Sequence, residues 1–210
     1  PQIVNAYYNP SNNEIVFPAG ILQPPFYDFQ ADPAVNYGGI GAVIGHEISH
    51  GFDDSGADYD GDGNLVKWWT DRDYEKFNEL GDSLAAQYSR IEVLPEVFIN
   101  GKFTLGENIG DLGGVNSAFD GLELYLSKHG SIQEIDGFSQ QQRFFISWAT
   151  IWRTKMREEA LRTRVTTDPH SPGMYRGYVP LQNIQAFYDA FNIQESDSMY
   201  ISPENRVKIW

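Results

Sequence analysis

The sequence predicts an α+β fold that is mostly helical, with a small β-sheet at its N-terminal end. In several long segments, apolar residues recur at helical spacing after a residue that can cap a helix. Runs of β-type residues occur only in the first twenty positions. The chain has 210 residues, of which 41% are hydrophobic, so it can bury one large core. No internal repeat or linker divides it, and we expect one domain over residues 1–210.

The N-terminal quarter predicts strands, a loop and a first helix. Residues 3–8 and 14–17 are β-type runs, and the Asn- and Pro-rich residues between them predict a hairpin. Residues 18–37 are rich in proline and aromatic residues, which indicates an ordered loop. An apolar helix is expected from Gly38 to about Gly51, followed over residues 53–64 by a loop dense in Asp and Gly.

Two amphipathic helices are predicted in the middle of the chain. Thr70 begins the first, because Asp73 stands at the spacing of a capping box. The second is expected over residues 107–128, with Gly130 as its stop. The apolar residues expected on their inner faces are Tyr74, Phe77, Leu84, Tyr88, Ile109, Leu112, Phe119, Leu122 and Leu126.

The C-terminal third predicts one further long helix and one short helix. Ser139, with a glutamine three residues later, predicts the start of the long helix. One face of that helix is expected to carry Phe145, Trp148, Trp152 and Met156. Residues 166–180 contain prolines and predict a loop, and residues 181–191 predict the last helix.

The charge and the composition exclude several classes of function. Fifteen basic residues against 29 acidic ones give a net charge of −14, which argues against nucleic acid and anionic membrane surfaces as partners. The absence of cysteine excludes disulfides, thiolate catalysis and cysteine-ligated zinc. No apolar run approaches the ~18 residues of a membrane span. We therefore expect no membrane contact from this segment.

The strongest functional signal is the segment His46-Glu47-Ile48-Ser49-His50. On a helix, residues i and i+4 lie on the same face, so both imidazoles can bind one ion, and Zn²⁺ is the ion that they suit. Glu47 projects close enough to take a proton from a water molecule at that ion. The alternative is a chance match on a buried helix, but polar groups on an otherwise apolar helix need a reason to be buried.

A catalytic zinc site takes a third protein ligand, and Glu107 is the best candidate. Asp111 follows it at i+4, so both carboxylates lie on one helix face. Glu107 can bind the metal while Asp111 accepts a hydrogen bond from the far nitrogen of a ligand histidine. The alternative is a solvated acidic helix start, since carboxylates are favoured near helix N-termini.

These motifs resemble the neprilysin and endothelin-converting-enzyme family of zinc endopeptidases. The resemblance rests on residues 46–54 and 106–111, supported by residues 4–8, 17–26 and 36–41, and by Asp168-Pro169-His170-Ser171-Pro172. It implies a thermolysin-like (gluzincin) catalytic domain and one zinc ion per chain, bound by His46, His50 and Glu107. It also implies Glu47 as the general base and Asp111 as the group that orients a ligand histidine.

The resemblance further implies how the peptide substrate is held. His170 corresponds to the histidine that stabilises the oxyanion, and Arg176 to the arginine that holds a substrate carbonyl. Asn5 and Ala6 match the edge strand that binds the peptide backbone. The residues that match the pocket for the side chain after the scissile bond are Phe26, Val43 and Trp152. The implied activity is endopeptidase cleavage of oligopeptides before a large hydrophobic residue.

The same family comparison sets expectations for origin and partners. Animal members carry a cysteine near the position of Val207, so this chain is expected to be a bacterial member. The family has an N-terminal helical region that roofs the catalytic cavity, and we expect it as a partner of this segment in a longer protein. The compartment stays open, with the cell envelope or the extracellular space favoured over the cytoplasm.

Two other functions remain as alternatives. The chain could be a zinc-binding but inactive fragment that acts as an interaction module. The chain could also be a non-enzymatic calcium-binding domain, because Asp58, Asp60 and Asp62 match the start of a calcium loop. Trp69 occupies the position of the bidentate glutamate of such a loop, so a Gly/Asp turn is favoured. Asp53 and Asp54 both follow His50 closely, and the sequence leaves open which of them supports that ring.

Overall fold

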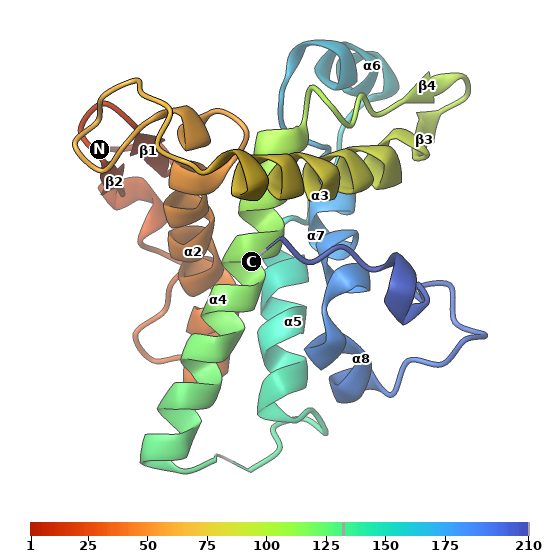
Figure 1. Cartoon of the computed structure of the whole chain (residues 1–210). Helices are drawn as coiled ribbons and strands as arrows, with labels where there is room; N and C mark the ends of the chain where they lie inside the picture. The colour runs from red at the N-terminus through yellow and green to blue at the C-terminus, as the bar shows by residue number, and fades with distance from the viewer. Residues whose placement is uncertain (132, 210) are drawn as a thin grey trace.

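Figure 1 shows the computed structural model, which describes residues 1–131 and 133–209 of a mostly helical chain with two small antiparallel sheets. The helices are α1 (Pro33–Asn36), α2 (Ala42–Ser49), α3 (Asp71–Ser89), α4 (Leu105–His129), α5 (Gln140–Ile151), α6 (Glu158–Thr167), α7 (Gly173–Tyr178) and α8 (Gln185–Phe191). The strands are β1 (Tyr7–Asn9), β2 (Glu14–Val16), β3 (Glu92–Leu94) and β4 (Val97–Phe98). The predicted fold class is confirmed.

Helix α4 runs between α2 and α5 at the centre of the molecule (Figure 1). The backbones of α2 and α4 approach closely because glycines face each other across the interface. A Cβ atom on Gly114 would lie 2.5 Å from the carbonyl oxygen of Ala42, and one on Gly45 would lie 2.8 Å from that of Gly114. This contact brings the end of α2 next to the start of α4.

The core surrounds these helices and continues to the C-terminal elements. Phe119 of α4 packs against Phe144 and Phe145 of α5, and Phe187 of α8 also contacts Phe145. Burying such side chains contributes roughly 1.5–3 kcal/mol each. The large apolar side chains that are fully buried include Trp148, Phe144, Phe145, Tyr88, Leu84, Leu122 and Ile109.

The helix caps predicted from the sequence are present. The Thr70 hydroxyl accepts a hydrogen bond from the backbone N–H of Asp73 at 3.2 Å, and Ser139 forms a complete capping box with Gln142. Gly130 ends α4 with a positive φ of 82°. Helix α4 begins two residues earlier than expected, at Leu105.

Two sequence expectations near the N-terminus are wrong in detail. The helical path to α2 begins at Pro33, because the Asp32 carboxylate caps α1 by accepting from the Ala34 N–H at 2.8 Å, and a π-helical turn joins α1 to α2. Strand β1 begins only at Tyr7, because Tyr7 pairs with Val16, the last residue of β2. The residues before Tyr7 have no partner in this sheet.

Two further expectations are wrong in the second half of the chain, and one hairpin in the first half was not predicted. The segment expected to be a loop over residues 166–180 contains the end of α6 and all of α7. Helix α5 ends at Ile151, so Met156 leaves its face and is 38% exposed. The β3–β4 hairpin was not anticipated. Within residues 1–131 and 133–209, no helix has the length and apolarity that a membrane crossing requires.

Candidate metal centre

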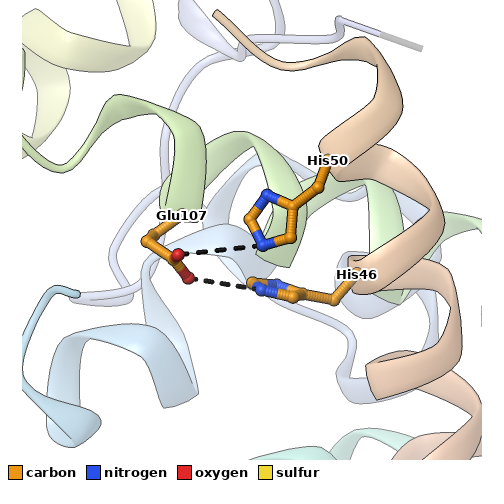
Figure 2. Close-up of side chains that lie close together, drawn as sticks. All are labelled: His46, His50 and Glu107. Atoms are coloured by element: carbon orange, nitrogen blue, oxygen red, sulfur yellow. Dashed lines mark ion pairs between the residues drawn. The ribbon is translucent and has the colours of Figure 1, made fainter. Parts of the chain in front are cut away.

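Three side chains from α2 and α4 converge on one point (Figure 2). His46 lies in the last turn of α2, and His50 is the residue that caps its C-terminus. Their rings are one helical turn apart, with centroids separated by 4.5 Å and planes inclined at 84°. Glu107 faces them from the first turn of α4.

The distances between these groups suit a metal ion. The Nε2 atom of His46 lies 3.3 Å from Glu107 Oε2, and that of His50 lies 3.7 Å from Glu107 Oε1. One ligand atom from each residue lies within 4.8 Å of the others. Ligands on a tetrahedral zinc ion, at bond lengths of ~2.0–2.2 Å, are about 3.3 Å apart, and two imidazoles with one carboxylate are a typical donor set for it.

A second carboxylate holds the outer nitrogen of each ring. His46 Nδ1 lies 2.9 Å from Asp111 Oδ1, and His50 Nδ1 lies 2.8 Å from Asp53 Oδ2. The structure therefore places Asp53, and not Asp54, against His50. The other oxygen of Asp53 accepts the backbone N–H groups of Ser55 and Gly56. With Nδ1 engaged in this way, each ring presents Nε2 to Glu107.

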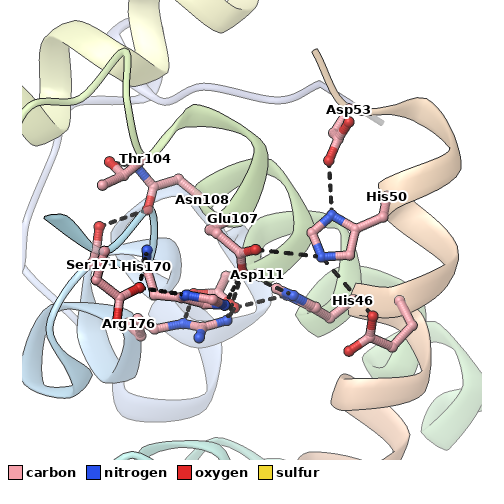
Figure 3. A network of polar contacts seen from close by, with 12 residues as sticks. His46, His50, Asp53, Thr104, Glu107, Asn108, Asp111, His170, Ser171 and Arg176 are labelled. Carbon is pink, nitrogen blue, oxygen red and sulfur yellow. Dashed lines mark hydrogen bonds and ion pairs between the residues drawn. The ribbon is translucent and has the colours of Figure 1, made fainter. Parts of the chain in front are cut away.

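Arg176 locks Asp111 from the opposite side (Figure 3). Its Nε and Nη2 atoms donate to the two Asp111 oxygens at 2.8 and 2.7 Å, and Nη2 also lies 3.5 Å from Glu107 Oε2. Its guanidinium stacks 3.8 Å above the Trp152 ring. Sequence analysis gave no sign of the pair between Arg176 and Asp111, which lie 65 positions apart.

The charges of this cluster shift the acidity of its members. Burial alone would lower the pKa of His46, but the Asp111 and Glu107 carboxylates beside it raise the pKa to about 9. Burial alone would raise the pKa of Glu107, but His46, Arg176 and His170 together hold it well below its usual range. The pKa of Asp111 is lowered as well, chiefly by Arg176, in spite of its complete burial.

Glu47 lies beside the three converging residues. It is buried, and its Oε2 atom lies 4.0 Å from His50 Nε2. Burial raises the pKa of this carboxyl, and the charges of His46 and His50 only partly offset the effect. A carboxylate with a raised pKa is a stronger base than an ordinary one, and it is available next to the metal-binding atoms.

His170 reaches the cluster from the loop between α6 and α7. Its Nε2 atom lies 3.2 Å from Glu107 Oε2, and its Nδ1 atom lies 2.7 Å from Asp168 Oδ1. The same Asp168 oxygen accepts the backbone N–H of His170 at 2.9 Å, which closes a tight turn. No role was expected for Asp168. An aspartate whose side chain accepts the backbone N–H two residues later is a common turn signal, which could have indicated this contact.

An open cavity of about 800 Å³ surrounds this cluster. The residues expected to hold a peptide all lie on its wall: Asn5, Ala6, Phe26, Val43, Trp152, His170 and Arg176. Asn5 and Ala6 are not within β1 but immediately precede it. The acidic 58–62 segment lies outside the metal cluster and forms a turn, in which Asp60 accepts the backbone N–H groups of Asp62 and Asn64 at 3.0 and 2.9 Å.

Two histidines one turn apart at the end of α2 thus face a carboxylate of α4 at the wall of an open cavity, and this donor set suits a zinc ion. The sequence profile of peptidase family M13 matches residues 5–207. The chain therefore belongs to peptidase family M13.

Known proteins from bacteria and animals resemble this chain over almost its whole length. It is 44% identical over 208 residues to a neutral endopeptidase of Lactococcus lactis subsp. cremoris and 41% identical over 212 residues to human neprilysin. An inhibitor complex of the Mycobacterium tuberculosis zinc metalloprotease Zmp1 superimposes with a TM-score of 0.96 at 52% identity and 99% coverage of this chain. The chain spans 31%, 28% and 32% of these three proteins, respectively.

Proposed function

We propose that this chain is the catalytic part of a zinc endopeptidase that cleaves oligopeptides before large hydrophobic residues. The observation that carries the proposal is the convergence of His46, His50 and Glu107, with buried Glu47 beside them, on the wall of an 800 Å³ cavity. Membership of peptidase family M13 supports it. The N-terminal region that the longer relatives have is the proposed partner that completes the cavity.

His46, His50 and Glu107 are the proposed ligands of one zinc ion per chain. A bound zinc ion would polarise the scissile carbonyl and lower the pKa of the attacking water. Asp111 and Asp53 keep the two imidazoles in the tautomer whose Nε2 atom carries the free electron pair. The charge of Arg176 keeps Asp111 ionised for this role.

Glu47 is the proposed general base. Its carboxylate takes a proton from the attacking water and delivers it to the nitrogen of the leaving amine. The raised pKa of Glu47 suits both steps, since the group must accept a proton and then release it.

His170 and Arg176 are the proposed groups that stabilise the reacting carbonyl. His170 Nε2 points at the ligand cluster, while the Asp168 carboxylate holds Nδ1 and fixes the direction of the ring. The imidazolium form of this ring would donate from Nε2 to the oxyanion. Arg176 is almost fully buried and fixed by Asp111, so it offers a positioned cation on the cavity wall. Both groups need no rearrangement when negative charge develops on the carbonyl oxygen.

The substrate is proposed to lie along the residues that precede β1. Asn5 and Ala6 line the cavity without a partner in the β1–β2 sheet, so their backbone groups can pair with an extended peptide. Phe26, Val43 and Trp152 form an apolar part of the wall. A large hydrophobic side chain after the scissile bond would bury its surface there.

The test is a cleavage map. A mixture of short peptides is incubated with the zinc-loaded protein, with the chelated protein and with the His46→Ala variant, and the new termini are identified. We expect cleavage by the zinc-loaded protein alone, with large hydrophobic residues at the new N-termini. Zinc binding without cleavage in this chain and in its full-length parent would support the inactive interaction module instead.

A further inference from the structure

A buried chain of polar side chains lies next to the metal centre but outside it (Figure 3). Asn108 follows Glu107 on α4 and is fully buried. Its amide nitrogen donates to Thr104 Oγ1 at 2.9 Å, and its amide oxygen accepts from the Ser171 hydroxyl at 2.8 Å. Ser171 is also fully buried, and it directly follows His170.

The position of Asn108 calls for a physical reason. Burying an amide is unfavourable unless it is hydrogen-bonded, and both polar atoms of the Asn108 side chain have a partner. The hydrogen bond that Asn108 makes reaches 63 positions along the chain, from α4 to the loop before α7. The amide therefore fixes this loop to the helix that carries Glu107.

A second contact of this loop, an ion pair with α6, is weaker than the hydrogen bond between Ser171 and Asn108. Arg164 of α6 pairs with Asp168 at 3.2 Å, but the two side chains are 35% and 29% exposed. Ion pairs that water reaches contribute little, typically under about 1 kcal/mol. Helix α6 itself is mostly exposed, with Val165 as its buried residue. The hydrogen bond between Ser171 and Asn108 is buried at both ends, so solvent does not weaken it.

We propose that Ser171 and Asn108 are positioning residues that hold His170 against Glu107. Because Asn108 and Glu107 are adjacent on α4, and Ser171 and His170 are adjacent in the loop, one hydrogen bond keeps the two functional groups in register. Loss of the bond leaves His170 in the chain but lets its ring move away from the developing oxyanion. The proposal rests on the role of His170 in the proposed function.

The test uses Ser171→Ala and Asn108→Ala in the full-length, zinc-loaded protein. Each variant should lower kcat for peptide cleavage by about ten- to a hundredfold, because small misplacements of a catalytic group have effects of this size. KM should change less than twofold, and zinc content should stay at the wild-type level. The matched control is Ser147→Ala, which removes another buried serine hydroxyl, bonded to the Val35 carbonyl at 2.7 Å, and should keep kcat.

The His170→Ala background shows whether the effect passes through His170. There, adding Ser171→Ala should change kcat less than twofold. An equal loss in both backgrounds, or no loss in the enzyme that contains His170, would overturn the proposal. Amide hydrogen exchange gives a readout that does not depend on activity: residues 168–172 should exchange at least tenfold faster in Ser171→Ala, while the segment over residues 46–50 should not change. Unchanged exchange of the loop in Ser171→Ala would also overturn the proposal. If the loop exchanged faster in Ser171→Ala but the wild-type protein cleaved no peptide, only the proposed function would be contradicted.

Discussion

At the scale of single residues, Glu47 is the proposed general base and is not one of the proposed zinc ligands. It lies beside the ligand cluster, yet the converging ligand atoms belong to His46, His50 and Glu107. We expect Glu47→Gln to keep its zinc and to lose at least about a hundredfold in turnover, the size of a lost general base. Zinc content and peptide cleavage are measured together, with Glu75→Gln on the exposed face of α3 as control. Near-normal turnover of Glu47→Gln would refute the proton path.

The raised pKa of His46 predicts how zinc affinity depends on pH. The protonated ring is stabilised by Asp111 and Glu107, so its pKa is about 9 compared with an ordinary 6.5. This stabilisation is fully present below about pH 6.5 and is lost as the pH rises through 9. Zinc needs the neutral ring, so protons compete with it over this whole range. We expect zinc affinity, measured by competition with a chelator, to keep rising from pH 6.5 to 9, whereas a plateau above pH 7 would contradict the raised pKa.

We expect substitutions of the two carboxylates of α4, Glu107 and Asp111, to lower zinc affinity by different amounts. Glu107→Ala removes a proposed zinc ligand, whereas Asp111→Ala removes the group at His46 Nδ1 and should lower zinc affinity by roughly ten- to a hundredfold. Asp111→Ala also removes the bidentate partner of the buried Arg176, which keeps only its 3.5 Å contact with Glu107, and this should lower the free energy of unfolding by about 3–5 kcal/mol.

Zinc titration and denaturant unfolding of the two variants, side by side, check this prediction. Asp111→Asn is the control, because it keeps the shape and part of the hydrogen bonding. The assignment of the two carboxylates would have to be exchanged if Asp111→Ala bound zinc more weakly than Glu107→Ala. If Asp111→Ala matched the wild type, Asp111 would have no role in holding the zinc site or Arg176.

At the residue scale, the site residues that could be predicted from the sequence are those that share a local motif. The i, i+4 spacing brought His46 with His50, and Glu107 with Asp111, onto common helix faces, and the structure has them there. It could not choose between Asp53 and Asp54, because that choice depends on how the chain turns after α2 ends. The contacts of Arg176 depend on tertiary packing, which no local pattern encodes.

At the scale of elements, helices were predictable where a cap and an apolar stripe coincide. Both are present in α3 and α5, which begin after Thr70 and Ser139 as expected. Helix α6 escaped prediction because only Val165 of its ten residues is buried, so it has no apolar stripe. The Asp32-Pro33 start of α1 is a helix signal that the proline-rich surroundings concealed.

The packing of α2 on α4 predicts the effect of one added methyl group. Gly114→Ala would place a carbon 2.6 Å from the backbone nitrogen of His46, and backbone atoms on both sides leave it no room. We expect the helices to separate, with a loss of about 1–3 kcal/mol in the free energy of unfolding and weaker zinc binding. In the control, Gly81→Ala on α3, the new carbon meets Leu105 at 3.4 Å, an ordinary contact. That variant should be neutral or up to about 1 kcal/mol more stable. Equal behaviour of the two variants, measured by urea unfolding and zinc titration, would contradict the close-packing argument.

At the scale of the whole molecule, helix α4 contributes to both the core and the metal centre, but different side chains make the contacts in each. The core joins α4, α5 and α8 through aromatic and aliphatic side chains. The proposed zinc ligands lie at one end of α2 and α4, where Asp53, Asp111 and Arg176 already fix their orientation. We therefore expect that folding of this chain does not depend on the metal in the way that it does in a small zinc finger.

This division predicts the outcome of metal removal. A zinc ion that binds the folded site and not the unfolded chain would add ~2.7 kcal/mol of stability at a free concentration of about 100 times Kd. For a chain of this size, that energy corresponds to a melting temperature about 5–10 °C higher. We expect chelated protein to keep its helical circular dichroism and its amide protection in α4 and α5, to melt earlier by this amount, and to recover fully when zinc is returned. The His46→Ala variant is the control, since its melting temperature should not respond to zinc. If the chelated chain lost its helical signal at 25 °C, the metal would be part of the core of the fold, and the hydrogen bonds of Asp53 and Asp111 would not be enough to hold the site together.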